Sequence, residues 1–511
     1  TRLATVISFF MWGWLCNRNP MVLIGGDILM TCLLFWACFL PLAARWSIDA
    51  ALSTTAPPRE SQHLSWASAG LLLQVMSVYF FSAFLKSGVE WMQDHSAVYY
   101  ALNLDRYATP LGQWLLQFPA LLELLTAYVW WLELLGPPLI LLAPLLGLKL
   151  GRPLRFLLLL AFVTLHLGFF LCLELGHFPF VSFSSLTVFL GGWFWDWRAR
   201  QPKAEWPIAI YYDQDCGFCR RTTLVIRTLL ALQNVRIEPA QPNARARALL
   251  EAHWSWVVID HEDRAHLKWG AFVVLVRVSP LFGWLHPLLA LKLFKPVGDA
   301  VYDFVGRHRG GIAGLTQGLL AERPLRFETG PGWQAVAAGF VVLVAAWNLS
   351  TIRALPITVQ AMLTPAFQML RIDQLWNMFA PYPLKDDGWM VVEGQLANGE
   401  TINVMKPGQP IDFEKPYQLS QTHENLRWHT YLGRLAEREF ASNRLWFAKY
   451  LCRSWNADKL SANREQRLMQ FKMHYVTERT PPPGQPFVTE RQVLWSHECF
   501  ASSTPEKGAA P

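Results

Sequence analysis

The sequence predicts a multi-pass α-helical membrane bundle, joined to a small α/β domain and to a C-terminal α+β extramembrane domain rich in β-hairpins. Of the 511 residues, 52% carry hydrophobic side chains and only 16% are charged, whereas soluble domains carry roughly 25% charged residues. Apolar stretches of bilayer length recur along the N-terminal part of the chain. We expect a membrane domain at 1–200, an α/β domain at 205–320, a further membrane helix at 333–351 and an extramembrane domain at 355–511.

The expected membrane helices are runs of mainly apolar residues, because about 20 such residues in an α-helix cross the hydrocarbon core of a bilayer. They lie at 3–15, 22–43, 67–86, 119–148, 153–174, 179–196 and 335–349. The run 119–148 contains Gly136, Pro137 and Pro138, and proline inside a helix kinks or breaks it. We expect this run to be kinked or split into two helices, and about six spans to form the bundle of residues 1–200.

Basic residues between the runs predict the orientation of the bundle. If successive runs alternate in direction, one side of the membrane carries Arg45, Arg59, Lys149, Arg152, Arg155, Arg198, Arg200 and Lys203. The positive-inside rule assigns that side to the cytoplasm. We predict a protein of the inner (plasma) membrane of a bacterium, with the 205–320 domain in the cytoplasm and the 355–511 domain in the periplasm or outside the cell. Lys86 then faces outward.

The net charge of +7 also has a bearing on partners. The basic residues lie in short runs beside apolar segments rather than along an aromatic-rich stripe, so we interpret them as topology signals and expect no nucleic-acid partner. The chain begins with residues typical of a helix and lacks a charged segment followed by a small-residue cleavage site. No signal peptide is expected.

The segment 205–312 alternates strand-like and helix-like runs. Strands are expected at 207–212, 235–239 and 254–260, and helices at 218–231 and 244–253. This order is typical of a small parallel or mixed sheet.

The C-terminal segment has a different pattern. Residues 389–405 alternate in polarity and turn at Asn398 and Gly399, which is a strong hairpin signal. A second hairpin is expected to join 470–478 and 488–499 across the prolines at 481–483. We expect a β-hairpin-rich sheet here.

Cys216 and Cys219 form the strongest chemical motif, because they are separated by two residues at the start of an expected helix, directly after a strand. Backbone N–H groups and the helix dipole stabilise a thiolate at that position. Arg220 and Arg221 would help, whereas the acids Asp213 and Asp215 would oppose the thiolate unless one of them shuttles protons.

The alternative interpretation of the two cysteines is half of a zinc site. Such a site needs four ligands, and no second Cys or His pair follows at the spacing of a zinc finger. We predict a redox-active Cys216–Cys219 disulfide and no metal.

The motif YYDQDCGFC, with Asp213 and both cysteines, and the later segment DAVYDFVGRHR near 299–309 resemble the DCC family of thiol-disulfide oxidoreductases. The resemblance covers about 205–312. It implies a thioredoxin-like fold in which Cys216 attacks a disulfide and Cys219 resolves the mixed disulfide. The implied partner is an unidentified protein or peptide with a thiol or disulfide.

The membrane part has its own set of polar residues. At 100° per residue, Tyr79, Ser82 and Lys86 fall on one face of their helix. Lys86 could serve as an interface anchor or as a functional group inside the bundle.

Three further ionisable residues lie within the expected spans, namely Glu123, Glu133 and His166. Each could lock helices together by hydrogen bonding, or together with Lys86 they could form a proton relay.

The run from Lys86 to Trp91, followed by HSAVYYAL and later by TLHLGFF, resembles the HTTM domain, which includes the vitamin K-dependent γ-glutamyl carboxylases. The segment LWNMFAPYPLKDDGWMVVEGQLANGETINV resembles the extramembrane segment of the same superfamily. The resemblance implies that Lys86 deprotonates a vitamin K-like hydroquinone and that His166 assists. The implied cofactors are a quinone with O₂ and CO₂.

Two of the other cysteines are expected to pair. Cys452 and Cys499 lie in the segment expected outside the cell, where disulfides persist, so we predict a structural disulfide between them. The remaining four, Cys16, Cys32, Cys38 and Cys172, lie in or beside apolar helices and are interpreted as packing residues.

Three functions follow from these residues. The first is a membrane redox enzyme in which Lys86 deprotonates a quinol and the Cys216/Cys219 pair supplies electrons. The second is a membrane thiol-disulfide oxidoreductase without oxygenation or carboxylation. The third is a non-enzymatic membrane scaffold whose redox domain is only structural.

Overall fold

The computed structural model describes residues 1–55, 63–192, 194, 208–232, 235–316, 318, 320–325, 329–457 and 464–500. Two compact units divide the chain. The first contains Thr1–Met11, Leu34–Leu71 and Val188–Leu343, and the second contains Trp12–Leu33, Leu72–Thr187 and Val344–Pro511.

Three helical stretches of the described chain are long and apolar enough to cross a membrane. They are α4 (Trp66–Leu85), the stretch Pro119–Cys172, and α18 (Pro331–Thr351). The stretch Pro119–Cys172 contains α8 (Pro119–Leu142), the short turn η2 (Ala143–Leu146) and α9 (Gly147–Cys172). The expected runs 119–148 and 335–349 fall within these stretches, the run 67–86 extends one residue beyond α4, and the run 153–174 extends two residues beyond α9.

Two other expected spans form shorter apolar helices. The run 22–43 forms α2 (Gly25–Ala37), and the run 179–196 forms α10 (Phe178–Leu186) with η3 (Thr187–Phe189), so far as its residues are described. Pro41 follows α2 and disfavours helical backbone in the residue before it. The run 3–15 lies within α1 (Arg2–Arg18).

Of the two expected alternatives, a kink or a split, the split at Gly136 is wrong, because α8 continues through Pro137 and Pro138 to Leu142. Gly136 allows a close contact between helices, since a Cβ there would lie 2.7 Å from the ring of Phe162 on α9. The missing side chain lets this buried aromatic ring pack against α8. The chain turns only later, at Gly147, whose φ of 73° suits glycine.

The α/β domain in the first unit is a four-stranded mixed sheet of order β2-β1-β3-β4. Its strands are β1 (Ile208–Tyr212), β2 (Val235–Pro239), β3 (Val257–Ile259) and β4 (Ala265–Leu267). The β1 and β2 strands are parallel, and the other two pairs are antiparallel. The mixed sheet confirms the expected fold class.

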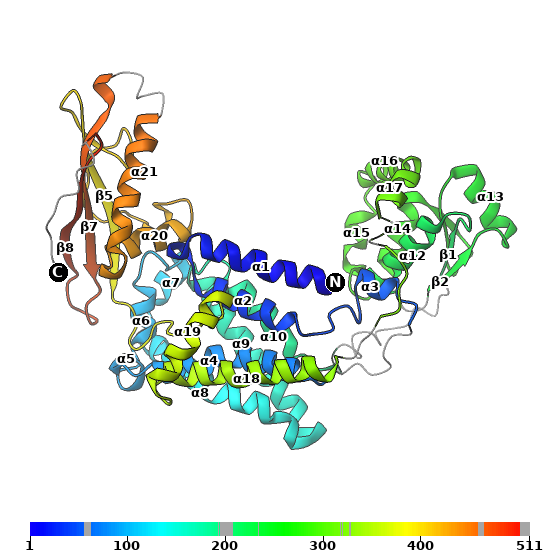
Figure 1. Ribbon diagram of the computed structural model, residues 1–511, viewed down its shortest axis with the longest axis horizontal. Helices are drawn as coiled ribbons and strands as arrows, with labels where there is room; N and C mark the ends of the chain where they lie inside the picture. The colour runs from blue at the N-terminus through cyan, green and yellow to red at the C-terminus, as the bar shows by residue number, and fades with distance from the viewer. Residues whose placement is uncertain are drawn as a thin grey trace. The chain divides into compact units, whose positions relative to one another are not determined.

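Helices cover both faces of this sheet (Figure 1). On one face, α12 (Gly217–Leu229) and α14 (Lys268–Arg277) share a core with Ile208 and Ile210. On the other, α13 (Ala244–His253) packs on Ala209 and Tyr211. Successive side chains of β1 point to opposite faces of the sheet, so this strand contributes residues to both cores. The neighbouring helices are α15 (His286–Leu289), α16 (Phe294–Arg307) and α17 (Arg309–Thr316).

The C-terminal part of the second unit is an antiparallel sheet of order β6-β5-β7-β8. Its strands are β5 (Asp386–Leu396), β6 (Thr401–Asn403), β7 (Leu468–Arg479) and β8 (Val488–Glu498). The expected turn at Asn398 and Gly399 joins β5 to β6, and the second expected hairpin joins β7 to β8.

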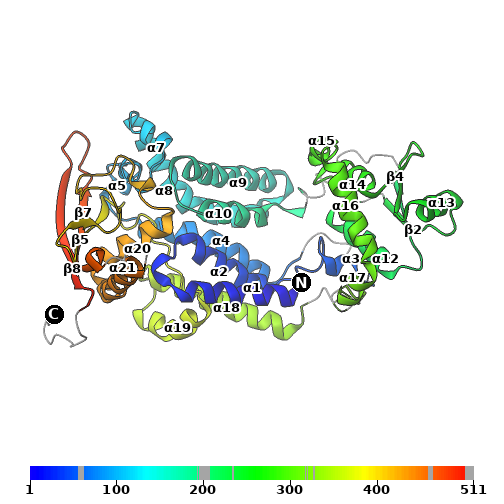
Figure 2. The ribbon, with the colours of Figure 1, turned by 90° about the horizontal axis from the view of Figure 1, so that it is seen from above.

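One face of this sheet packs on α20 (Leu426–Ala436) and α21 (Arg444–Ala457) around a shared apolar core (Figure 2). The remaining described α-helices are α3 (Ile48–Ala51), α5 (Val89–Met92), α6 (Ala97–Leu102), α7 (Pro110–Leu115) and α19 (Ile357–Leu370).

Candidate functional site

Cys216 and Cys219 are joined by a disulfide at the N-terminus of α12, with their Cα atoms 5.2 Å apart. Cys216 is the N-cap residue of the helix, and its Sγ accepts a hydrogen bond of 3.2 Å from the backbone N–H of Cys219. When the bond is reduced, this N–H and the positive end of the helix dipole stabilise a thiolate on Cys216. The geometry suits Cys216 as the attacking sulfur.

The charged neighbours of the disulfide make specific contacts of their own. Asp213 accepts a 3.0 Å hydrogen bond from Gln241 and forms a 3.5 Å ion pair with Arg309. Asp215 is exposed. The negative charge of Asp213, which would oppose a thiolate, is therefore partly balanced by Arg309.

The two arginines after the motif also have acceptors. Arg220 forms an ion pair with Glu322, while Arg221 donates 3.1 Å and 3.2 Å hydrogen bonds to the carbonyl oxygens of Gly217 and Leu320. The positive charge of Arg221 lies near the first turn of α12 and contacts only neutral carbonyl oxygens in these two bonds. The positive charge of Arg220 is instead balanced by the Glu322 carboxylate.

A cavity of about 610 Å³ lies beside Cys219. Its walls come from α12, from the segment around β3, from α14 and from α16, and they are mainly apolar and aromatic. The aromatic residues that line it are Tyr212, Phe218, Trp254, Trp256, Trp269, Phe272 and Tyr302. This size and lining are typical of a small-molecule site.

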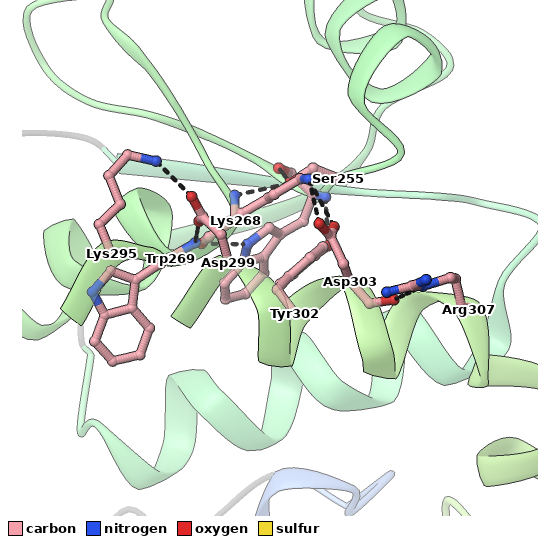
Figure 3. A network of polar contacts seen from close by, with 9 residues as sticks. Ser255, Lys268, Trp269, Lys295, Asp299, Tyr302, Asp303 and Arg307 are labelled. Atoms are coloured by element: carbon pink, nitrogen blue, oxygen red, sulfur yellow. Dashed lines mark hydrogen bonds and ion pairs between the residues drawn. The ribbon is translucent and has the colours of Figure 1, made fainter. Parts of the chain in front are cut away.

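Polar contacts cross the cavity wall between α14 and α16 (Figure 3). The ammonium of Lys268 forms a 2.7 Å ion pair with Asp303, and its backbone N–H donates to Ser255 over 2.9 Å. The hydroxyl of Tyr302 accepts a 2.9 Å hydrogen bond from the N–H of Trp256. The ion pair connects α14 with α16, and the two hydrogen bonds connect α14 and α16 with the segment that precedes β3.

A second pair of contacts lies at the start of α16 (Figure 3). Asp299 accepts a 3.1 Å hydrogen bond from the N–H of Trp269 and pairs with Lys295 at 2.6 Å. Partial burial opposes ionisation, but these two donors hold the pKa of Asp299 below its usual value. Burial raises the pKa of Tyr302. The sequence interpretation missed these residues, although the acids Asp299 and Asp303, four positions apart on a helix, were a signal for a shared face.

Lys86 follows the last residue of α4 and is buried, with 4% of its surface exposed. Its ammonium forms an ion pair with Glu133 of α8 and lies 4.4 Å from the ring centroid of Trp91. Ser82, one turn earlier on α4, is also buried. Four residues selected from the sequence thus lie in one region of the bundle.

Tyr79 and His166 form a second buried contact on the same face of α4. The Tyr79 hydroxyl lies 2.7 Å from Nε2 of His166 on α9. Among the described residues, Nδ1 of His166 has no hydrogen-bond partner. By contrast Glu123, on α8 like Glu133, is exposed, so of these two glutamates Glu133 is the one buried beside Lys86.

The second disulfide joins Cys452 of α21 to Cys499, which directly follows β8. It fastens the helical layer of the C-terminal domain to its edge strand. In the part of the chain that the structure describes, no three His, Cys, Asp or Glu residues are grouped to hold a metal ion.

Comparison with known proteins supports the redox domain. A model of the family DCC1-like thiol-disulfide oxidoreductase matches residues 210–315, which include both cysteines, α16 and most of the cavity lining. No curated protein and no solved structure matches the chain. The resemblance of the membrane part to the HTTM domain and the carboxylases gains no support from these comparisons and stays a prediction.

Proposed function

We propose that the protein is a membrane-anchored thiol-disulfide oxidoreductase that exchanges two electrons between its Cys216/Cys219 pair and a thiol or disulfide partner. The position of Cys216 at the N-terminus of α12, with the Cys219 N–H directed at its sulfur, carries this proposal. The match of residues 210–315 to DCC1-like oxidoreductases supports it. The apolar helices α4, α8, α9 and α18 supply the anchor.

The exchange proceeds in two displacements. In the reduced protein the Cys216 thiolate attacks one sulfur of a partner disulfide, which forms a mixed disulfide and releases one partner thiolate. The Cys219 thiolate then attacks Cys216, forms the internal disulfide and releases the second partner thiolate. Two electrons pass to the partner, and two protons from the protein thiols balance the released thiolates.

The test compares two single replacements in the full-length protein. Cys219→Ser lacks the resolving sulfur and should trap a mixed disulfide with glutathione disulfide, whereas Cys216→Ser should trap far less. Labelling of the wild type in glutathione redox buffers should give one two-electron transition. A pair that cannot be oxidised and reduced, or a Cys216 thiol with an ordinary pKa of about 8.5, contradicts the proposal.

A second candidate function is a quinol reaction in the membrane part, in which Lys86 takes a proton from a vitamin K-like hydroquinone. The observation in its favour is the burial of Lys86 together with Glu133, Tyr79 and His166. The free Nδ1 of His166 offers a polar atom for a quinol hydroxyl. In this step the ion pair would first pass the lysine proton to the Glu133 carboxylate, which leaves a neutral Lys86 amine to accept the proton of the quinol hydroxyl.

When bound, the hydroquinone would react with O₂. If the protein carboxylates a substrate, CO₂ would be consumed as well. The test is consumption of reduced vitamin K with O₂ by the wild type, Lys86→Ala and the exposed-site control Glu123→Gln. This function requires turnover that is lost in Lys86→Ala and kept in Glu123→Gln. Equal rates in all three proteins, or no turnover in the wild type, leave the ion pair as a structural element of a scaffold.

A further inference from the structure

The cavity beside Cys219 has features that the exchange with a thiol partner does not use. It holds about 610 Å³, and Phe218 and Cys219 form part of its wall. Aromatic rings from three other segments, among them Trp254, Trp269 and Tyr302, face the same space. A partly open cavity of this size with aromatic walls suits a planar apolar molecule better than the backbone of a peptide.

Two positively charged side chains lie among these aromatic rings. Lys268 and Arg309 both line the cavity, and each is held by an acid, Asp303 and Asp213 respectively. Side chains fixed in this way can donate hydrogen bonds to carbonyl oxygens at the edge of a ring without losing their own counter-charge.

The outer face of α16 continues the apolar character of the cavity. Val297, Val301 and Phe304 are exposed by 62%, 59% and 57%, and their spacing places them on one side of the helix. Val301 also lines the cavity. Arg307, three residues after Phe304, places a positive charge beside the end of this stripe, as in helices that contact a lipid surface.

The chain length limits how far this domain can lie from a bilayer. From the end of α16 at Arg307 to the start of α18 at Pro331 there are about 24 residues, which span at most about 80 Å when extended. Since α18 is long and apolar enough to cross a membrane, the domain stays within reach of molecules that dissolve in lipid.

We propose that the cavity beside Cys219 binds a lipid-soluble quinone, which accepts the two electrons of the reduced Cys216/Cys219 pair. The inference rests on the proposed redox function and names the small-molecule partner of that site. Quinones are planar, apolar two-electron carriers of membranes, and thiol-disulfide systems are known to pass electrons to them.

The electron transfer balances as two steps. The Cys219 thiolate, which faces the cavity, adds to a ring carbon of the quinone and forms a C–S bond. The Cys216 thiolate then attacks the Cys219 sulfur, so that the S–S bond forms and the C–S bond breaks. The electron pair of the broken bond stays on the ring, and the two protons of the original thiols complete the hydroquinone.

Gly306 allows a direct test, because it lines the cavity and a Cβ there would meet no atom within 4 Å. Gly306→Phe should fill the cavity without a clash. Gly311→Phe is the matched control, since Gly311 of α17 has equally open surroundings but does not line the cavity. Full-length wild type and both variants are reduced without O₂ in lipid nanodiscs and mixed with decylubiquinone or with glutathione disulfide.

Mass spectrometry of the alkylated tryptic peptide 204–220, which contains both cysteines, measures the fraction oxidised. We expect decylubiquinone to oxidise the wild type and Gly311→Phe at similar rates, with one hydroquinone formed per disulfide, and Gly306→Phe at least tenfold more slowly. Glutathione disulfide should oxidise all three proteins equally.

Two results overturn the quinone site while leaving the redox function intact. One is equal quinone rates in the two variants, and the other is a wild type that reacts with glutathione disulfide but not with decylubiquinone. A wild type that reacts with neither oxidant removes the redox function as well. If Gly306→Phe slows oxidation by both oxidants, the wild type is photolabelled with an azidoquinone. Labels on cavity-lining residues that decrease when decylubiquinone is added support the site. Labels on other residues overturn it.

Discussion

The ammonium of Lys86 lies 4.4 Å from the centre of the Trp91 ring, so the five-residue spacing of these two residues is a contact in space. The lysine and the tryptophan are both 4% exposed. Trp91 is oriented by a 2.8 Å hydrogen bond from its indole N–H to the carbonyl of Phe379. The cation is therefore held by the aromatic ring and by the Glu133 carboxylate, a combination that is strongest where water is excluded.

The buried pair of Lys86 and Glu133 predicts non-additive effects on stability. Lys86→Met leaves the Glu133 carboxylate without its partner and should lower the free energy of unfolding by about 3–5 kcal/mol. The double variant Lys86→Met/Glu133→Gln removes both charges and should recover most of that loss. Thermal unfolding in detergent, followed by tryptophan fluorescence, measures the difference. Equal melting temperatures for the single and double variants would show that the charges do not depend on one another.

Two glycines of α16 predict opposite responses to alanine. A Cβ on Gly298 would lie 2.2 Å from the Trp269 ring, so Gly298→Ala should overpack the contact with α14 and destabilise the domain by about 1–3 kcal/mol. Gly306→Ala meets open space and should stabilise the helix by up to about 1 kcal/mol. Hydrogen exchange of β1 amides in the full-length protein reports the stability of this domain. The same change in both variants would contradict the packing of α16 on Trp269.

The redox motif and the hairpins were predictable because their signals are local. Cys216 and Cys219 lie within one turn of a helix, and Asn398 with Gly399 specifies a tight turn by its own backbone preferences. The cavity was not predictable, since its walls come from segments as distant as Cys219 and Arg309. Only the fold of the sheet brings these segments together.

The two glutamates of α8 show a second limit of sequence interpretation. Glu123 and Glu133 lie in the same apolar run, and composition gives them equal weight. Ten residues on a helix correspond to about 1000° of rotation, so the two side chains leave the helix in different directions. The packing of α8 then buries Glu133 beside Lys86 and exposes Glu123.

The Cys452–Cys499 disulfide predicts a marked loss of stability on reduction. It closes a loop with a sequence separation of 47 residues, for which loop-closure entropy gives about 4 kcal/mol. Cys452→Ser/Cys499→Ser should lower the denaturant midpoint of the C-terminal domain, as reported by proteolysis of the full-length chain. Wild type treated with a reductant should match the double variant, and the double variant itself should not respond to the reductant. A double variant as stable as the oxidised wild type would contradict a stabilising role.

Asp387 of β5 predicts a stability that falls as pH rises. The side chain is 2% exposed, accepts a hydrogen bond from the N–H of Asp105 and lies 3.6 Å from Nε of Arg106. Burial is the main cause that raises its pKa to about 6, against the lowering effect of Arg106.

The folded protein binds this proton more tightly than the unfolded chain, so stability decreases between about pH 4 and pH 6. The difference between a pKa of about 6 in the folded protein and the ordinary value of 3.8 corresponds to about 3 kcal/mol. Asp387→Asn cannot ionise, and its melting temperature relative to wild type should therefore rise from pH 4 to pH 7. The neighbour Asp386, whose side chain is 58% exposed, provides the control: the gap between Asp386→Asn and wild type should stay nearly constant. A constant or shrinking gap for Asp387→Asn would mean that Arg106 outweighs burial and that the carboxylate is ionised throughout this range.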